Sequence, residues 1–154
     1  MEDIAKRVHV EPPFDEGKVV NNLPVELALV VPSTNADEEY IGDGNFQNRV
    51  EYVEKKFDQW FGGDTTTEAV GGYTWEDDDG NVHRTEEKVA VVMAGTTEQV
   101  YKSHKKDLKE LIKKRQRNWK QDTIAFRIDD RTYIYPRKEY IDNEDRAKMD
   151  VLIP

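Results

Sequence analysis

The chain of 154 residues carries 32 acidic and 23 basic side chains, which gives a formal net charge of −9. It contains no cysteine, so disulfide bonds, thiol nucleophiles and thiolate metal sites are excluded. Without a long apolar run or a secretory signal at its start, the sequence predicts a cytoplasmic protein that does not enter a membrane.

The first part of the chain predicts an irregular arm, then a strand and a helix. Residues 1–23 form the arm, because prolines, asparagines and a glycine interrupt them. Residues 24–31, PVELALVV, predict a strand, and a polar loop then extends to Asn45. In residues 46–61 the apolar side chains recur at spacings of three and four, which predicts an amphipathic helix that ends at Gly62.

Two strands joined by a hairpin turn are predicted next. Residues 66–75 and 82–94 have strand-like composition, and the Asp-Gly pair at 79–80 is a strong signal for a tight turn between them. The Gly-Gly pair at 71–72 predicts a β-bulge in the first of these strands, or a point where a ligand or another segment comes close.

The last predicted elements are a second helix and a short hairpin. The helix covers residues 97–119, and its start fits a capping box in which Thr96 and Gln99 exchange hydrogen bonds with free backbone N–H groups. Residues 123–128 and 131–135 predict two short strands joined by a turn.

The resulting order is strand, helix, strand, strand, helix, strand, with one further strand added. It resembles the ferredoxin-like α+β fold, an antiparallel sheet with two helices on one face. We therefore expect a ferredoxin-like domain over residues 24–136 with an extra C-terminal hairpin strand, preceded by the arm at 1–23 and followed by a charged tail at 137–154. The resemblance rests on element order, so it transfers no functional residues from a known family.

Two of the predicted strands are apolar on both faces. Residues 27–31 and 89–94 are apolar at consecutive positions, whereas a sheet with one solvated face alternates apolar and polar side chains. We therefore expect the face opposite the helices to be covered. The N-terminal arm, a second copy of the chain or another protein are the candidates for this cover.

The predicted hairpin at 68–87 carries the candidate ligand-binding residues Tyr73, Trp75, His83 and Glu87. Strand alternation places positions 83 and 87 on the same face. A calcium loop is disfavoured because Trp75 would occupy a ligand position, and a zinc site because the histidines lack ligand spacing. We predict no catalytic residue, metal or cofactor here, and the plainer interpretation is a surface hairpin with packed aromatic side chains.

The second predicted helix is strongly basic. Residues 102–120 hold nine basic and two acidic side chains, among them the anion-binding candidates Lys105, Lys109, Lys113 and Arg117. This pattern favours either a solvated helix face or a docking surface for phosphates, nucleic acid or an acidic partner. The common mode of RNA binding on a βαββαβ sheet is disfavoured, because residues 86–94 contain no aromatic side chain.

The sequence shows no arrangement of catalytic residues, and its strands have more apolar surface than one core requires. Together these features predict a non-catalytic interaction or regulatory module. It would act as a homodimer or by docking to another protein. Two alternatives remain open. One is binding of nucleic acid or nucleotide phosphates by the helix at 97–119, and the other is a small-molecule-binding protein or enzyme with its pocket at the 68–87 hairpin.

Overall fold

The computed structural model describes residues 23–136. The predicted tail at 137–154 and all but the last residue of the predicted arm at 1–23 lie outside the described residues. The described elements are β1 (Val25–Pro32), α1 (Asp43–Phe61), β2 (Thr65–Glu76), β3 (Val82–Thr96), α2 (Glu98–Asn118), β4 (Ile124–Ile128) and β5 (Arg131–Tyr135). Their order matches the order predicted from the sequence.

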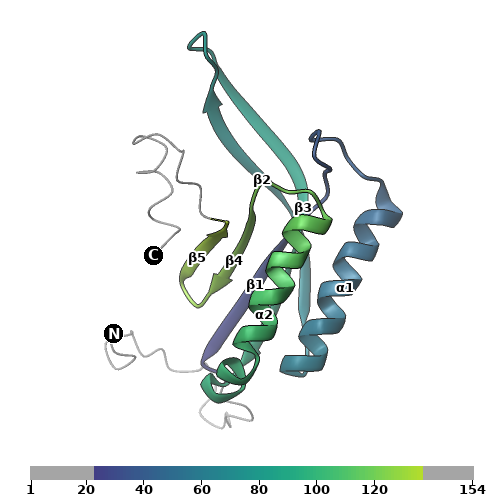
Figure 1. The fold of residues 1–154 in the computed structure, drawn as a ribbon, viewed down its shortest axis with the longest axis vertical. Helices are drawn as coiled ribbons and strands as arrows, with labels where there is room; N and C mark the ends of the chain where they lie inside the picture. Colours follow the sequence, from purple (N-terminus) through teal and green to yellow (C-terminus); the bar gives the residue numbers. More distant parts are fainter. Residues whose placement is uncertain (1–22, 137–154) are drawn as a thin grey trace, which may run out of the picture.

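The described strands form one antiparallel sheet in the order β2-β3-β1-β4-β5. Both helices lie on the same face of this sheet (Figure 1). The central position of β1 between β3 and β4 is the strand order of a ferredoxin-like fold, and β5 adds one strand beyond β4. The predicted α+β fold, with its extra C-terminal hairpin strand, is therefore confirmed.

The core fills the space between the sheet and the two helices. Leu29 of β1 and Val92 of β3 are fully shielded from solvent, and Val53 and Phe57 of α1 pack into the same cluster. The side chains from α2 in this cluster are Leu108, Leu111 and Ile112. The apolar stripes of both helices and every second residue of the central strands thus meet in one core.

The sheet face opposite the helices is apolar at its centre but less shielded. Val30 of β1 and Val91 of β3 are directly paired, and both are half-buried. Leu23 approaches this face near the end of β3, since a Cβ added to Gly95 would lie 3.3 Å from the Leu23 side chain. The last residue of the predicted arm therefore covers one end of the face, and self-association across the remainder stays a prediction.

A glycine ends α1, and a threonine hydroxyl caps the start of α2. Gly62 ends α1 in the left-handed conformation with φ 84°, as predicted. The predicted capping box at Thr96 is wrong, because Thr96 is the buried last residue of β3. The cap is Thr97, whose hydroxyl accepts a hydrogen bond from the backbone N–H of Val100 at 3.2 Å. Neither helix within residues 23–136 is long and apolar enough to cross a membrane.

The β2–β3 hairpin projects well beyond the rest of the sheet (Figure 1). β1 pairs with β3 as far as Val89, whereas β2 and β3 continue to pair to Glu76 and Val82, so the outer hairpin has only two strands. A β-bulge at 71–72 was predicted, but the pairing register runs through this point without interruption. Gly72 instead makes room for Arg84, since an added Cβ would lie 2.6 Å from its guanidinium nitrogen.

The acidic run at the hairpin tip forms the predicted turn. The backbone N–H of Gly80 donates to the carbonyl of Asp77 at 3.0 Å, and Gly80 has φ 81°. The Asp77 carboxylate accepts hydrogen bonds from the backbone N–H groups of Asp79 and Asn81. These acids therefore stabilise a tight turn, for which a glycine with positive φ is well suited.

Candidate functional site

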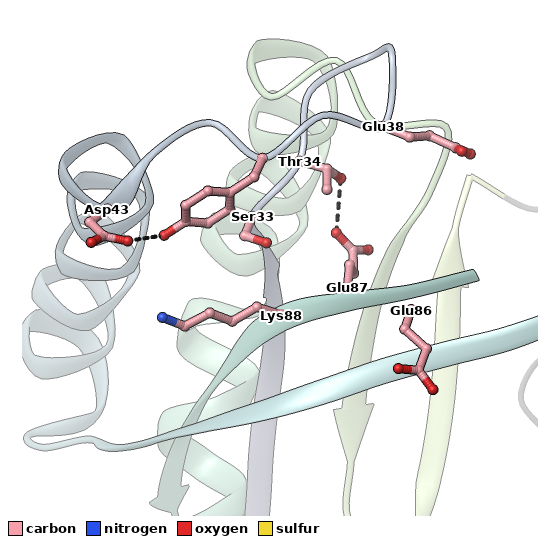
Figure 2. A pocket seen from close by; sticks show the side chains of 8 residues that line it. Ser33, Thr34, Glu38, Asp43, Glu86, Glu87 and Lys88 are labelled. Carbon is pink, nitrogen blue, oxygen red and sulfur yellow. Dashed lines mark hydrogen bonds between the residues drawn. The ribbon is translucent and has the colours of Figure 1, made fainter. Parts of the chain in front are cut away.

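A polar pocket of about 480 Å³ lies where the loop after β1 meets the base of the projecting hairpin. The loop and the start of α1 contribute Ser33, Thr34, Glu38, Tyr40 and Asp43, and β3 contributes Glu86, Glu87 and Lys88. The fold explains this meeting, because β1 and β2 run in the same direction, which brings the β1–α1 loop and the β2–β3 hairpin to the same end of the sheet. Figure 2 shows Glu87 pointing toward Thr34 and Glu86 pointing away from it.

One hydrogen bond joins the loop to β3 at the wall of the pocket. The hydroxyl of Thr34 donates to the Glu87 carboxylate at 2.8 Å (Figure 2). The backbone carbonyl of Thr34 accepts from Arg49 of α1 at 3.0 Å and from Gln121 at 2.7 Å. Burial lowers the pKa of Arg49, while the nearby Glu87 carboxylate acts in the opposite direction. Arg49 and Gln121 therefore hold Thr34 from behind the pocket, and Thr34 in turn holds Glu87.

The loop that closes the other side of the pocket has its own internal order. The side chain of Asn35 accepts hydrogen bonds from the backbone N–H groups of Asp37 and Glu39 at 2.8 and 3.0 Å. Thr34 and Tyr40 form an isolated antiparallel bridge across this loop. Such local side-chain to backbone bonds fix a loop conformation without a helix or strand. They place Tyr40 beside the start of α1.

Tyr40 and Asp43 form a hydrogen-bonded pair at the edge of the pocket. The phenol of Tyr40 donates to the Asp43 carboxylate (Figure 2). This bond raises the pKa of Tyr40, so the phenol stays protonated at neutral pH. The pair presents an acceptor-rich, negatively charged edge with an aromatic ring beside it.

Lys88 is the basic side chain among the described residues that line the pocket. Its ammonium group lies 5.5 Å from the ring centroid of Phe46 and 3.5 Å from the Glu68 carboxylate. The lining also contains four carboxylates, so the lining residues together carry a formal charge of −3. Within residues 23–136, no group of three or more acidic or histidine side chains converges closely enough to hold a metal ion. The pocket is negatively charged but does not have the arrangement of a metal site.

The structure separates the four ligand-binding candidates of the hairpin. Glu87 lines the pocket, whereas Trp75 and His83 pair across the strands nearer the tip and stack with ring centroids 4.6 Å apart. His83 also contacts the Asp77 carboxylate at 2.7 Å, and Trp75 donates to Thr85 at 2.9 Å. His83 and Glu87 are four positions apart along the strand, a distance of about 13 Å.

The side chain of Tyr73 lies outside the described part of the hairpin, although its backbone pairs with Thr85. Trp75 and His83 therefore belong to a surface cluster at the outer hairpin, and ligand binding by this cluster stays a prediction.

The anion-binding candidates lie on α2, away from the polar pocket. Lys105 and Lys109 line a groove between α2 and the β4–β5 hairpin. Lys113 is half-buried further along the helix, and Arg117 is exposed near its end. Nucleic-acid binding by this basic face stays a prediction.

Most pocket residues were missed in the sequence, and a topological signal could have identified them. Ser33, Thr34, Tyr40 and Asp43 lie in or just after a long polar loop that carries no recognisable motif. In a ferredoxin-like fold, however, the loop after the first strand lies at the same sheet end as the hairpin between the second and third strands. Polar side chains in those two segments were therefore candidates for a shared site.

No protein-family model matches the sequence. No curated protein matches it either. Among solved structures, the chain is similar to a phage SAM lyase in complex with S-methyl-5'-thioadenosine, with 12% sequence identity and a TM-score of 0.52. The similarity covers 80% of this chain and 100% of the lyase chain. At this identity the similarity shows a shared fold.

Proposed function

We propose that this protein binds a small, positively charged organic ligand in the polar pocket between the β1–α1 loop and β3. The observation that carries the proposal is the excess of acidic over basic side chains in the pocket lining, where Glu38, Asp43 and Glu87 outnumber Lys88, while Glu86 points away from Thr34 (Figure 2). Its volume of about 480 Å³ falls within the range of small-molecule sites, which is about 300–1,000 Å³. The proposal develops the small-molecule alternative, with Glu87 as the predicted residue that reaches the site.

The arrangement of the side chains favours an organic cation over a metal ion. Carboxylates on Asp43 and Glu87 lie on opposite sides of the pocket, each already hydrogen-bonded to a neutral hydroxyl group. Tyr40, which also lines the pocket, offers an aromatic surface, and aromatic faces attract diffuse cations such as substituted ammonium or sulfonium groups. A ligand with a polar body and one such cationic centre matches these groups.

The solved neighbour suggests a first probe. That protein is a SAM lyase and was solved with S-methyl-5'-thioadenosine, a neutral nucleoside. S-adenosylmethionine carries the same nucleoside with an aminocarboxypropyl chain added to the sulfur, which becomes a sulfonium centre, so the two compounds differ in the charge that the pocket is proposed to recognise and in this chain. We propose a nucleoside-sized sulfonium or ammonium compound as the ligand class.

Isothermal titration calorimetry of the full chain with both compounds tests this proposal. We expect S-adenosylmethionine to bind and the neutral nucleoside to bind more weakly. Glu87→Gln is expected to weaken binding of the sulfonium compound about tenfold, equivalent to about 1.4 kcal/mol. Glu110→Gln, an exposed change on α2 remote from the pocket, is the matched control and is expected to leave the affinity unchanged. Equal affinity for the charged and neutral compounds, or binding of neither, would overturn the proposal.

A second proposal, self-association, rests on the exposed apolar side chains of the projecting hairpin. Val70 and Val82 are 69% and 70% exposed and lie on one face of the hairpin, whereas Trp75, which is 43% exposed, lies on the other. A two-stranded ribbon standing alone in water is marginally stable, so contact with another surface would stabilise it. We propose that a second copy of the chain supplies this contact and that the protein acts as a homodimeric module. Both proposals take the protein as cytoplasmic, as the cysteine-free composition predicts.

Sedimentation analysis of the purified chain tests self-association. We expect a dimer that dissociates when Val70 and Val82 are both changed to lysine, since the added charges would have to be buried at the contact. The control is Gln47→Lys on the exposed face of α1, which is expected to remain dimeric. A wild-type chain that sediments as a monomer at high concentration would contradict this second proposal.

A further inference from the structure

An apolar groove of about 410 Å³ lies between α2 and the β4–β5 hairpin, separate from the polar pocket. Figure 1 shows this hairpin extending to the side of α2 that faces away from α1. The lining residues are Tyr101, Lys105, Leu108, Lys109 and Ile112 from α2, with Phe126, Ile128, Tyr133 and Tyr135 from the hairpin. Leu108 and Ile112 belong to the buried core and also line this groove, so the groove borders the core-facing side of α2.

The floor of the groove is aromatic and aliphatic, and its rim is basic. Phe126 and Tyr133 stack with ring centroids 5.1 Å apart. Tyr101 is half-buried at the groove, and this burial raises the pKa of its phenol. Lys105 and Lys109 are exposed along the α2 edge. Such a surface matches a peptide segment that combines apolar with acidic side chains.

We propose that this groove binds residues 149–153 of the same chain, MDVLI. The chain leaves β5 at Tyr135, which itself lines the groove, so the following segment starts beside its proposed binding site. The thirteen residue steps from position 136 to position 149 span at most about 45 Å when extended, more than the length of α2, about 31 Å. The segment can therefore reach any point along the groove.

Charge complementarity supports the same occupant. Residues 139–150 contain five acidic and two basic side chains, a formal charge of −3, and they lead directly into the apolar run. The apolar side chains of Val151, Leu152 and Ile153 would cover the aromatic floor while Asp150 lies near the lysine rim. Burial of these side chains supplies the stabilisation, and the lysines set the direction of the segment. The inference is independent of the ligand proposed for the polar pocket.

Disulfide trapping in the full chain tests the proposal, because the natural chain has no cysteine. Lys109→Cys is combined with Val151→Cys, and oxidation is followed on non-reducing gels with peptide mass mapping. We expect an intramolecular disulfide that forms at least tenfold faster than in the matched pair Glu110→Cys with Val151→Cys. Glu110 is an exposed residue of the same helix that does not line the groove.

A further variant tests the charge contribution. Adding Asp150→Lys to the first cysteine pair would place a positive charge near Lys105 on the rim of the groove. This repulsion is expected to slow disulfide formation several-fold at low salt. Equal trapping rates in the two cysteine pairs would overturn the proposal. A disulfide-linked dimer in place of the intramolecular product would overturn it too, since the groove would then hold the segment of a second copy.

Discussion

Glu87 of β3 accepts a hydrogen bond from Thr34 at 2.8 Å, although the two residues are 53 positions apart in the sequence. Their contact joins the end of β1 to the base of the projecting hairpin and forms one wall of the polar pocket. It depends on Arg49, which holds the loop from behind through the backbone carbonyls of Pro32 and Thr34. The pocket is thus formed by long-range contacts in the fold.

Replacing Arg49 with methionine is expected to destabilise the protein by about 1–3 kcal/mol. The change removes the guanidinium donor from the carbonyls of Pro32 and Thr34, of which Thr34 still accepts from Gln121, and the loss of charged hydrogen bonds to partly buried acceptors carries a cost of this size. Urea unfolding measures the loss. Arg84→Met, at an exposed arginine of the hairpin, is the control and is expected to change stability by less than about 0.5 kcal/mol.

Replacing Gly62 with alanine is expected to destabilise α1 by about 1 kcal/mol. Gly62 holds a left-handed backbone conformation with φ 84°, where a Cβ atom introduces strain. Gly63 lies next to it without a positive φ and with open space around its Cα, so Gly63→Ala is expected to be neutral or slightly stabilising. Thermal unfolding of the two variants gives the comparison. Equal destabilisation would show that the conformation of Gly62 is not the cause.

The hairpin tip is expected to loosen in acid. Hydrogen bonds from His83 and from the backbone of Asn81 lower the pKa of Asp77 below its ordinary value of 3.8. A lowered carboxyl pKa stabilises the folded tip above pH 3.8, and this contribution is lost as the pH falls through the lowered pKa. Amide signals of Asp79 and Asn81 in an NMR titration would report the change. It should disappear in Asp77→Asn and persist in Asp78→Asn.

The two faces of β1 are expected to differ in their sensitivity to truncation. Leu29 is fully buried against the helices, so Leu29→Ala should cost about 2–5 kcal/mol. Val30 is half-buried on the opposite face, and Val30→Ala should cost about 1 kcal/mol or less. Chemical unfolding of the isolated variants measures both values. Equal costs would indicate that the opposite face is buried as deeply as the core.

The sequence by itself determined the element order, the helix stop at Gly62 and the tight turn before Gly80. These features are local, because hydrophobic periodicity and the conformational freedom of glycine act over a few residues. The same local reasoning placed the α2 cap at Thr96, one residue early, because it could not show that Thr96 belongs to β3.

The tertiary structure decided which of the candidate residues meet. Trp75 and His83 stack at the outer hairpin, while Glu87 joins Thr34, Tyr40 and Asp43 in a pocket that no sequence motif marks. Strand pairing across long separations brings these groups together, and the register is set by how the two apolar strand faces pack. Spacing along one strand shows on which face of the sheet a residue lies. Its neighbours from other elements depend on how the whole sheet is assembled.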